Sequence, residues 1–365
     1  MGGMKEVRKM KRKSILFLAM ILMGIFVFGG CADKAEEEKE QERYKVSILI
    51  PGKHIDGGFM EAAFRGYTQV REKLPVDVDY ISEVSATSDV KVLTDAMRAL
   101  AEKGPDMIIG HGGQCNVPAQ TIAKEFPDIR FVVIQGNVKG DNLSSYVVLQ
   151  EESAWLAGAL AGLTTKSDVV GHISGAWPNP GLIGRAAFYD GLMYTNPDAK
   201  FLTWFTGNLD DKEINRAAAE AEIKYGADVI YTMLNSGRAG VIDQIKSTNG
   251  AVRHIGNVSD WTKVDKSFIG SAVADSSVAI FNAVKDLVDG KWKANEVLSI
   301  GLEEESVVRL AMASDVPKDI QDKIKDLAAK LEKGEITIKT TYAGQEFYPA
   351  TGAFVDQSFK ETLKK

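Results

Sequence analysis

The sequence is poor in the residues that crosslink small folds or bind metal ions. Only two of its 365 residues are cysteines, Cys31 and Cys115, which excludes a framework of disulfides. Its four histidines show no HExxH spacing and have no CxxC pair nearby, so the common zinc motifs are absent. A chain of this length, 45% of it hydrophobic, buries a core large enough to fold without such links.

The motifs of the common enzyme classes are also missing. There is no GxSxG nucleophile elbow and no GxxxxGKS/T phosphate loop, and the glycine-rich stretch 110–113 (GHGG) is not GxGxxG. Cys115 has no partner histidine that the sequence places beside it, and a lone cysteine is more often a small buried hydrophobe. We therefore expect no enzymatic activity, no cofactor and no metal.

Basic residues are scarce outside the first 30 positions. Six of the 44 Lys and Arg, but only one of the 50 Asp and Glu, lie in residues 1–30, so residues 31–365 carry a formal charge of −11. Binding to nucleic acid requires clustered Lys and Arg that neutralise phosphates. The acidic body argues against a nucleic-acid partner.

The N-terminus has the order of a secretory signal peptide. Basic residues up to Lys13 precede the apolar run Ile15–Phe28, whose 14 residues fall short of the ~20 of a spanning helix. Gly29, Gly30 and Cys31 follow, which resembles a bacterial lipobox with Phe28 where Leu is usual. This resemblance implies cleavage before Cys31 and a diacylglycerol anchor on its sulfur; an uncleaved signal anchor is the alternative.

Downstream of this segment, strand and helix patterns alternate. This order predicts an α/β fold of two lobes, each a parallel doubly wound sheet flanked by helices. The central stretch Glu151–Thr165 has helical period, and its small residues leave one face nearly flat, so another backbone can approach it closely. We take it as the crossing from the first lobe to the second. The expected division is signal peptide 1–30, acidic tether 31–43, first lobe 44–150, crossing helix and hinge 151–167, second lobe 168–275, and return segment 276–365 completing the first lobe.

Ligands of such sheets bind beyond the carboxyl ends of the strands, and the loops there carry aromatic rings and polar side chains. This set suits a flat apolar ligand edged with polar groups. Structural roles are the alternative, since Phe59 also fits a helix core and Trp261 fits a strand end. The candidate ligand-binding residues are Asp56, Phe59, His111, Gln114, Asn116, Gln135, Trp177, Asn208, Asn235, Asp260 and Trp261.

The chain resembles the basic membrane protein family of bacterial substrate-binding lipoproteins, which includes purine-nucleoside receptors. The matching stretches, in this order, are DGGF at 56–59, AKEFPDIRFVV at 123–133, EESAWLAGALAG at 151–162, VGHISG at 170–175, GADVI at 226–230, SD at 259–260 and DGKW at 289–292. The resemblance implies the two-lobed periplasmic-binding fold and capture of a small molecule for an ABC permease and ATPase.

The same resemblance assigns the family's first-lobe aromatic stacker to Phe59, the acid near it to Asp56 and the acid of the second-lobe loop to Asp260. The chain departs from nucleoside receptors at two polar positions. Val258 stands where those receptors have an acid, and Ala274 stands near the position of their lysine. An aromatic often present after Gly207 is replaced by Asn208 or Leu209, and Trp177 is the candidate to compensate. The ligand class therefore stays open between a purine nucleoside and a free nucleobase.

The sequence thus predicts a monomeric solute receptor, lipid-anchored on the outer face of the cytoplasmic membrane, that delivers its ligand to an ABC importer. A receptor for a membrane signalling partner, or for a different small polar ligand, is the alternative. A transcription regulator of the same fold would need an N-terminal helix-turn-helix, and a signal peptide occupies that place.

The lipobox predicts the consequence of one substitution. Cys31→Ser removes the sulfur that accepts the lipid, so the variant should be released or remain unprocessed. Electrophoretic mobility and membrane fractionation of the expressed protein measure this. Unchanged processing and membrane retention in the variant would contradict a lipoprotein.

Overall fold

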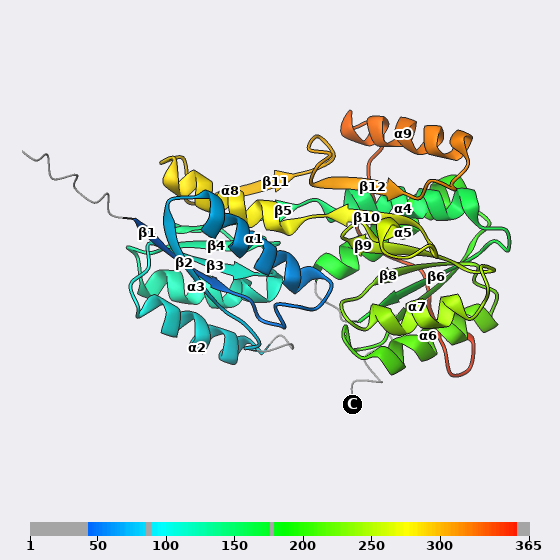
Figure 1. Cartoon of the computed structure of the whole chain (residues 1–365), viewed down its shortest axis with the longest axis horizontal. Coiled ribbons are helices and arrows are strands. Elements are labelled where there is room, and N and C mark those ends of the chain that lie inside the picture. Colours follow the sequence, from blue (N-terminus) through cyan, green and yellow to red (C-terminus); the bar gives the residue numbers. More distant parts are fainter. Residues whose placement is uncertain (1–42, 85–88, 176–178, 356–365) are drawn as a thin grey trace, which may run out of the picture. The chain divides into compact units, whose positions relative to one another are not determined.

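The computed structural model describes residues 43–84, 89–175 and 179–355. They belong to one compact unit that begins at Arg43. Two six-stranded sheets organise these residues, and each is covered by helices on both faces (Figure 1). The predicted fold class is confirmed.

The first sheet has the order β11-β5-β4-β3-β1-β2, and every neighbouring pair is parallel. Side chains alternate along each strand, so Ile109 faces helices α1 and α8 while Ile108 faces α2 and α3. We call this sheet with its four helices the first lobe. Its elements are β1 (Tyr44–Leu49), α1 (Phe59–Lys73), β2 (Val76–Ile81), α2 (Val90–Ala101), β3 (Met107–His111), η1 (Gly113–Cys115), α3 (Asn116–Glu125), β4 (Arg130–Ile134), β5 (Leu143–Val148), α8 (Ser276–Val288) and β11 (Val297–Ile300).

The second sheet has the order β12-β10-β9-β8-β6-β7 and is parallel except for the edge pair β10–β12. Adjacent residues of one strand face opposite sides. Tyr231 faces helices α4 and α5, and Ile230 faces helices α6 and α7. This is the second lobe. Its elements are α4 (Gln150–Thr164), β6 (Val169–Ser174), α5 (Asn179–Thr195), β7 (Lys200–Phe205), α6 (Lys212–Lys224), β8 (Val229–Met233), α7 (Arg238–Lys246), β9 (Arg253–Val258), η2 (Trp261–Lys263), β10 (Phe268–Ala274), β12 (Val308–Met312), α9 (Lys318–Glu332), β13 (Glu346–Tyr348) and β14 (Ala353–Val355).

The chain passes between the lobes three times, after β5, after β10 and between β11 and β12. The return to the first lobe is seen in α8, which packs on α1 so closely that a Cβ on Gly66 would lie 2.9 Å from Ile280 (Figure 1). The prediction that residues 276–365 complete the first lobe is wrong from Val308 on. That strand pairs antiparallel with the free edge of β10, and α9 packs on α4, so both cover apolar surface of the second lobe.

Helices α4 and α5 touch backbone to backbone, as the small residues of the central stretch predict. A Cβ on Gly158 would lie 1.9 Å from the carbonyl oxygen of Phe188, and one on Gly191 would lie 2.0 Å from that of Trp155. A side chain at either position would force the helices apart. The contact fixes α5, whose first turn borders the candidate site, against α4.

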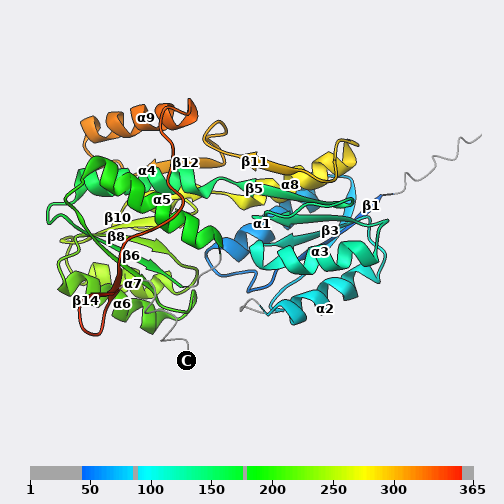
Figure 2. The same ribbon diagram turned by 180° about the vertical axis from the view of Figure 1, so that it is seen from behind.

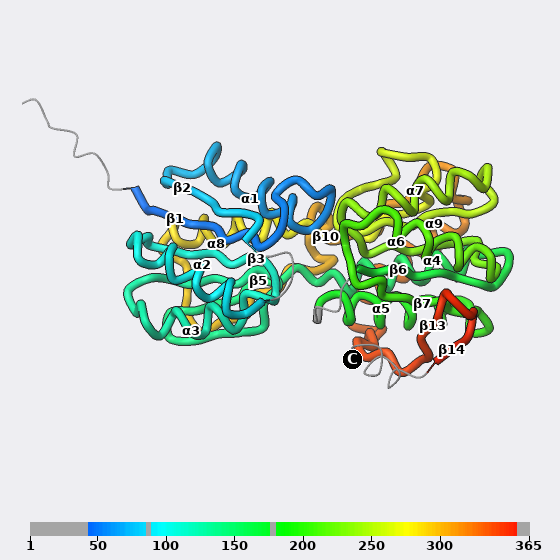
Figure 3. Tube along the Cα trace, turned by 90° about the horizontal axis from the view of Figure 1, so that it is seen from below, coloured from blue at the N-terminus to red at the C-terminus, as the bar shows by residue number. Residues whose placement is uncertain are grey.

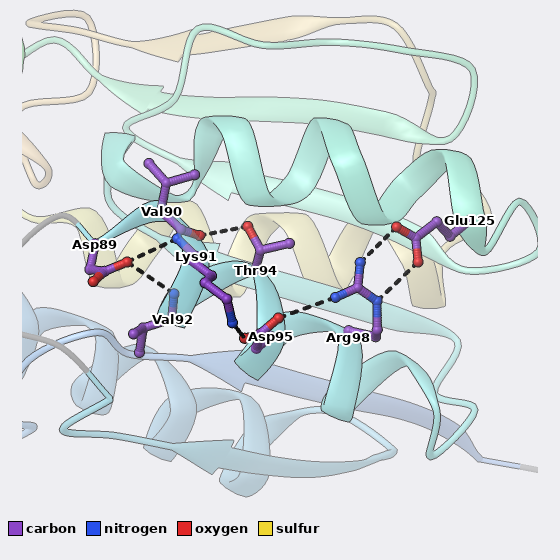
Figure 4. Close-up of polar contacts among 8 residues, drawn as sticks. All are labelled: Asp89, Val90, Lys91, Val92, Thr94, Asp95, Arg98 and Glu125. Atoms are coloured by element: carbon purple, nitrogen blue, oxygen red, sulfur yellow. Dashed lines mark hydrogen bonds and ion pairs between the residues drawn. The ribbon is translucent and has the colours of Figure 1, made fainter.

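Helices α2 and α3 are joined at the surface by charged side chains (Figure 4). Asp89 accepts hydrogen bonds from the amides of Lys91 and Val92 and so caps α2. Arg98 on α2 then makes a two-pronged ion pair with Glu125 on α3, with donor–acceptor distances of 3.0 and 2.7 Å. The pair links the two helices that cover this face of the first sheet.

The C-terminal segment after α9 runs along the second lobe and ends in β13 and β14 (Figure 2), with β13 beside β7 (Figure 3). Its anchor is an ion pair between Glu346 and Arg185 of α5, 2.6 Å apart, with side chains 0% and 4% exposed. The Arg185 guanidinium also lies 4.1 Å from the ring centre of Tyr342 and 5.0 Å from that of Phe205. Among the described residues, no helix has both the length and the apolarity needed to cross a membrane.

The buried pair predicts a large effect of removing one partner. Glu346→Ala leaves the Arg185 cation buried without its carboxylate, which should lower the free energy of unfolding by about 3–5 kcal/mol. Urea unfolding followed by circular dichroism measures the change. Asp322→Ala, which breaks the exposed Lys318–Asp322 pair, is the control and should change stability by no more than about 0.5 kcal/mol. Equal effects of the two substitutions would refute the anchoring role.

Candidate functional site

The candidate site is a hollow of about 130 Å³ lined by strand-end loops of both lobes. A second hollow of about 380 Å³ adjoins it, since the two share Gly113, Gln114, Gln150 and Pro180. None of the described residues that line the smaller hollow carries a formal charge. They are Phe59, Met60, Gly113, Gln114, Gln150, Ser174, Pro180, Gly181, Leu209, Met233, Leu234, Asn235, Asn257 and Val258.

Phe59 and His111 form a stack beside this hollow. Their ring centres are 4.1 Å apart with an interplanar angle of 27°, and His111 Nε2 lies 2.9 Å from the Phe59 carbonyl oxygen. Because a carbonyl only accepts, Nε2 carries the proton and donates. Burial lowers the pKa of His111 to about 4, so the imidazole is neutral at pH 7. Its Nδ1 atom has no hydrogen-bond partner among the described residues.

Asp56 is buried and caps helix α1. Its carboxylate accepts hydrogen bonds from the amides of Gly58, Met60 and Glu61, at 2.8, 3.3 and 3.0 Å. Burial raises the pKa of Asp56 above its ordinary value, and the negative charge of Asp210 adds to this effect. Asp56 therefore holds Phe59 at the start of the helix.

Two residues of the second lobe bind the backbone of this same turn. Asn235 Oδ1 accepts a hydrogen bond of 3.3 Å from the Phe59 amide, and Arg238 Nη1 donates one of 3.2 Å to the Gly57 carbonyl. Asn235 was predicted from its place after β8. Arg238 was missed, because a single arginine at the start of a helix gives no sequence signal that its guanidinium is buried.

Three predicted residues of the first lobe lie at the wider hollow. Gln114 also lines the smaller hollow and makes no side-chain hydrogen bond to another described residue, so its amide is available to a ligand. Asn116 donates to the side chain of Asn137 at 2.9 Å. The amide of Gln135 instead joins strands β4 and β5, donating to the Val148 carbonyl and accepting from the Val148 amide at 2.9 and 2.5 Å.

The remaining predicted residues of the second lobe make contacts within their own loops. Asn208 is exposed and accepts hydrogen bonds from the amides of Asp210 and Asp211. Asp260 caps η2 through Thr262 and pairs with Lys263 at 3.1 Å. Partial burial raises the pKa of Asp260, but these contacts outweigh burial, so the pKa lies below its ordinary value. Trp261 donates to the Asn257 carbonyl. Asp260 and Trp261 do not line either hollow, although the Trp261 ring reaches to within 3.8 Å of a Cβ placed on Gly57.

Two predicted functional residues, Trp177 and Cys31, lie outside the described residues. Strained backbone occurs at the hollow in Val258, which has a φ of 68°. A positive φ is unusual for a β-branched residue, and such strain clusters at binding sites. Sequence patterns give no sign of it.

Possible metal ligands are not gathered at one place in the described part of the chain. Residues 43–84, 89–175 and 179–355 contain no cluster of three or more His, Cys, Asp or Glu side chains suited to a metal ion. Cys115 is buried, and burial raises the pKa of its thiol to about 12. A thiol protonated at neutral pH is a poor nucleophile.

The fold and the hollow between its lobes define a solute-binding protein of the two-lobed type. A family model described as "ABC transporter substrate-binding protein PnrA-like" matches residues 43–342, and the chain belongs to that family. The resemblance drawn from the sequence motifs is thereby confirmed.

Individual relatives agree with this membership. Basic membrane protein A1 of Borrelia garinii subsp. bavariensis is 25% identical over 88% of this chain and 95% of its own length. A purine-binding protein of Brucella abortus is 25% identical over 93% of this chain and 90% of its own. A solute-binding protein of an ABC transporter system from Aeropyrum pernix K1 superposes with a TM-score of 0.71 at 20% identity, covering 82% and 94% of the two chains, which supports the fold.

The buried imidazole of the stack predicts a pH dependence of stability. The folded pKa of His111 is about 4, against about 6.5 when unfolded, so only the unfolded state takes up this proton between those values. Stability should fall as the pH drops from 6.5 to 4, with His111 contributing up to about 3 kcal/mol. His111→Gln should remove this part of the decline in urea unfolding at pH 7 and 4.5.

Buried His254, whose pKa burial also lowers, keeps its own contribution in the variant. An undiminished decline in His111→Gln would mean that His111 is protonated in the folded protein.

Proposed function

We propose that the protein is a solute receptor, lipid-anchored through Cys31, that holds a purine nucleoside or nucleobase between its lobes and delivers it to an ABC permease and ATPase. The observation that carries the proposal is the Phe59 ring, which lines the hollow and rests on the neutral imidazole of His111. A ring fixed in this way offers a platform on which a flat heterocycle can stack.

The chemistry of the walls supports a neutral ligand. The smaller hollow is bordered by apolar side chains and by amides, with no charged side chain among its described lining residues. An amino acid or an organic acid would bring a buried charge without a partner, which is costly. A purine has polar edges that an amide such as that of Gln114 can pair with and apolar faces that suit the Phe59 ring.

Size bears on which purine derivative binds. The smaller hollow alone lies below the ~300–1,000 Å³ typical of ligand sites, whereas the adjoining one falls within that range. A free base suits the smaller hollow, and a ribose would extend past the shared residues into the wider one. The similarity to a purine-binding relative is consistent with both.

A thermal-shift screen of purine bases, purine nucleosides, pyrimidines, sugars and amino acids tests the ligand class. A ligand at a hundredfold excess over its dissociation constant should stabilise the folded protein by about 2.7 kcal/mol. Native mass spectrometry of freshly purified protein identifies any ligand that is retained. A shift by sugars or amino acids with none by purines would contradict the proposal.

Phe59→Ala should weaken the binding of the identified purine about tenfold or more, because it removes the stacking surface as well as buried apolar area. Isothermal titration calorimetry measures the affinity. Phe64→Ala is the matched control, since Phe64 lies on the same helix but packs against Tyr67 and Tyr80 and does not line the hollow. Equal losses in the two variants would point to a damaged helix instead of a binding platform.

A further inference from the structure

The first turn of α1 is held from the opposite lobe through its backbone. The Gly57 carbonyl accepts from Arg238 at 3.2 Å, and the Phe59 amide donates to Asn235 at 3.3 Å. Both second-lobe residues belong to the loop and helix start that follow β8. The position of the Phe59 ring relative to the second lobe therefore depends on contacts that involve no ligand.

Arg238 is a buried cation, 1% exposed, and none of the ion pairs among the described residues includes it. Its guanidinium donates to neutral oxygens, those of Thr232, Leu234 and Asn257 in its own lobe and that of Gly57 in the other. The Trp261 ring covers one face, with Cζ 4.2 Å from the ring centre. Burying a guanidinium is costly unless its N–H groups find acceptors, and the Gly57 carbonyl supplies the acceptor for Nη1 that the second lobe does not.

Gly58 shows how closely the two lobes meet at this point. A Cβ on Gly58 would lie 2.4 Å from Asn235 Oδ1 and 3.1 Å from the Asn235 Cα, and these nearest atoms all belong to the second lobe. Alanine at this position would therefore push the lobes apart, while the nearest obstacles to its methyl group lie outside the first lobe.

We propose that Arg238 is a positioning residue that ties the first turn of α1 to the second lobe through the Gly57 carbonyl, so that ligand affinity depends on it although it does not line the hollow. The proposal rests on the proposed function in assuming a ligand held between the lobes. A ligand that contacts both lobes binds only when they are closed together, and its apparent affinity scales with the fraction of closed molecules. Arg238 raises that fraction.

Two variants test this from opposite sides of the contact. Arg238→Lys keeps the positive charge but replaces the fork of donors by one ammonium, which cannot serve acceptors in both lobes. Gly58→Ala inserts a methyl group where Asn235 lies. Each should weaken the binding of adenine, guanine and their nucleosides, used as probes, by roughly tenfold, the loss that corresponds to one hydrogen bond from a charged donor. Each should also increase the radius of gyration in small-angle X-ray scattering.

Arg185→Lys is the matched control. It makes the same exchange at a buried arginine of the second lobe that pairs with Glu346 and makes no contact with the first lobe in the described structure. It should lower the melting temperature but leave the radius of gyration unchanged. Unchanged affinity and radius of gyration in Gly58→Ala would overturn the proposal, and so would an affinity loss in Arg238→Lys that Arg185→Lys reproduces without a change in radius.

The scattering measurement separates this proposal from the proposed function. If no purine binds the wild-type protein, the ligand class is wrong, but the unliganded Arg238→Lys and Gly58→Ala variants should still be more extended than the wild type. If Arg238→Lys fails to fold, Gly58→Ala decides alone, because it changes no charge and removes no hydrogen-bonding group of either lobe.

Discussion

Three amide groups at the start of helix α1 converge on the buried carboxylate of Asp56, and the first-lobe half of the site depends on that cap. The first N–H groups of a helix have no partner within the helix, so a helix start placed at an interface must be satisfied from outside. Because Asp56 does so, the turn is fixed with the Gly57 carbonyl directed at Arg238 and the Phe59 ring on His111. The family resemblance assigns the Asp56 carboxylate to ligand binding. In the structure, that carboxylate already binds the backbone amides of the helix start.

The second-lobe half depends on a different constraint, the contact of α4 with α5 through Gly158 and Gly191. Because of that contact, the first turn of α5 lies at the edge of the hollow, which Pro180 and Gly181 line. There Gln150 donates a hydrogen bond of 2.7 Å to the Pro180 carbonyl. Gln150 begins the helix that follows the first passage between lobes. The wall of the site is therefore continuous with the link between the lobes, and a movement of one lobe changes the shape of the hollow.

Sequence patterns predicted most of this framework because it follows from local periodicity. The predicted helix Glu151–Thr165 is α4 shifted by one residue. The path after Ile300 was not predictable, since β12 joins the second sheet through an antiparallel pairing that its own composition does not encode. Arg238 was missed for a related reason: only the packed structure surrounds a lone arginine with Thr232, Leu234, Asn257 and a tryptophan ring.

Among the predicted polar residues, the structure separates side chains engaged in the fold from those available to a ligand. The carboxylates of Asp56 and Asp260 and the amide of Gln135 bind neighbouring backbone or side chains, whereas the amide of Gln114 makes no hydrogen bond to another described residue and faces both hollows. One amide exchanged at such a position alters which edge of a ligand is satisfied. We therefore infer that ligand choice depends on the few polar groups that the fold does not already use, such as the amide of Gln114.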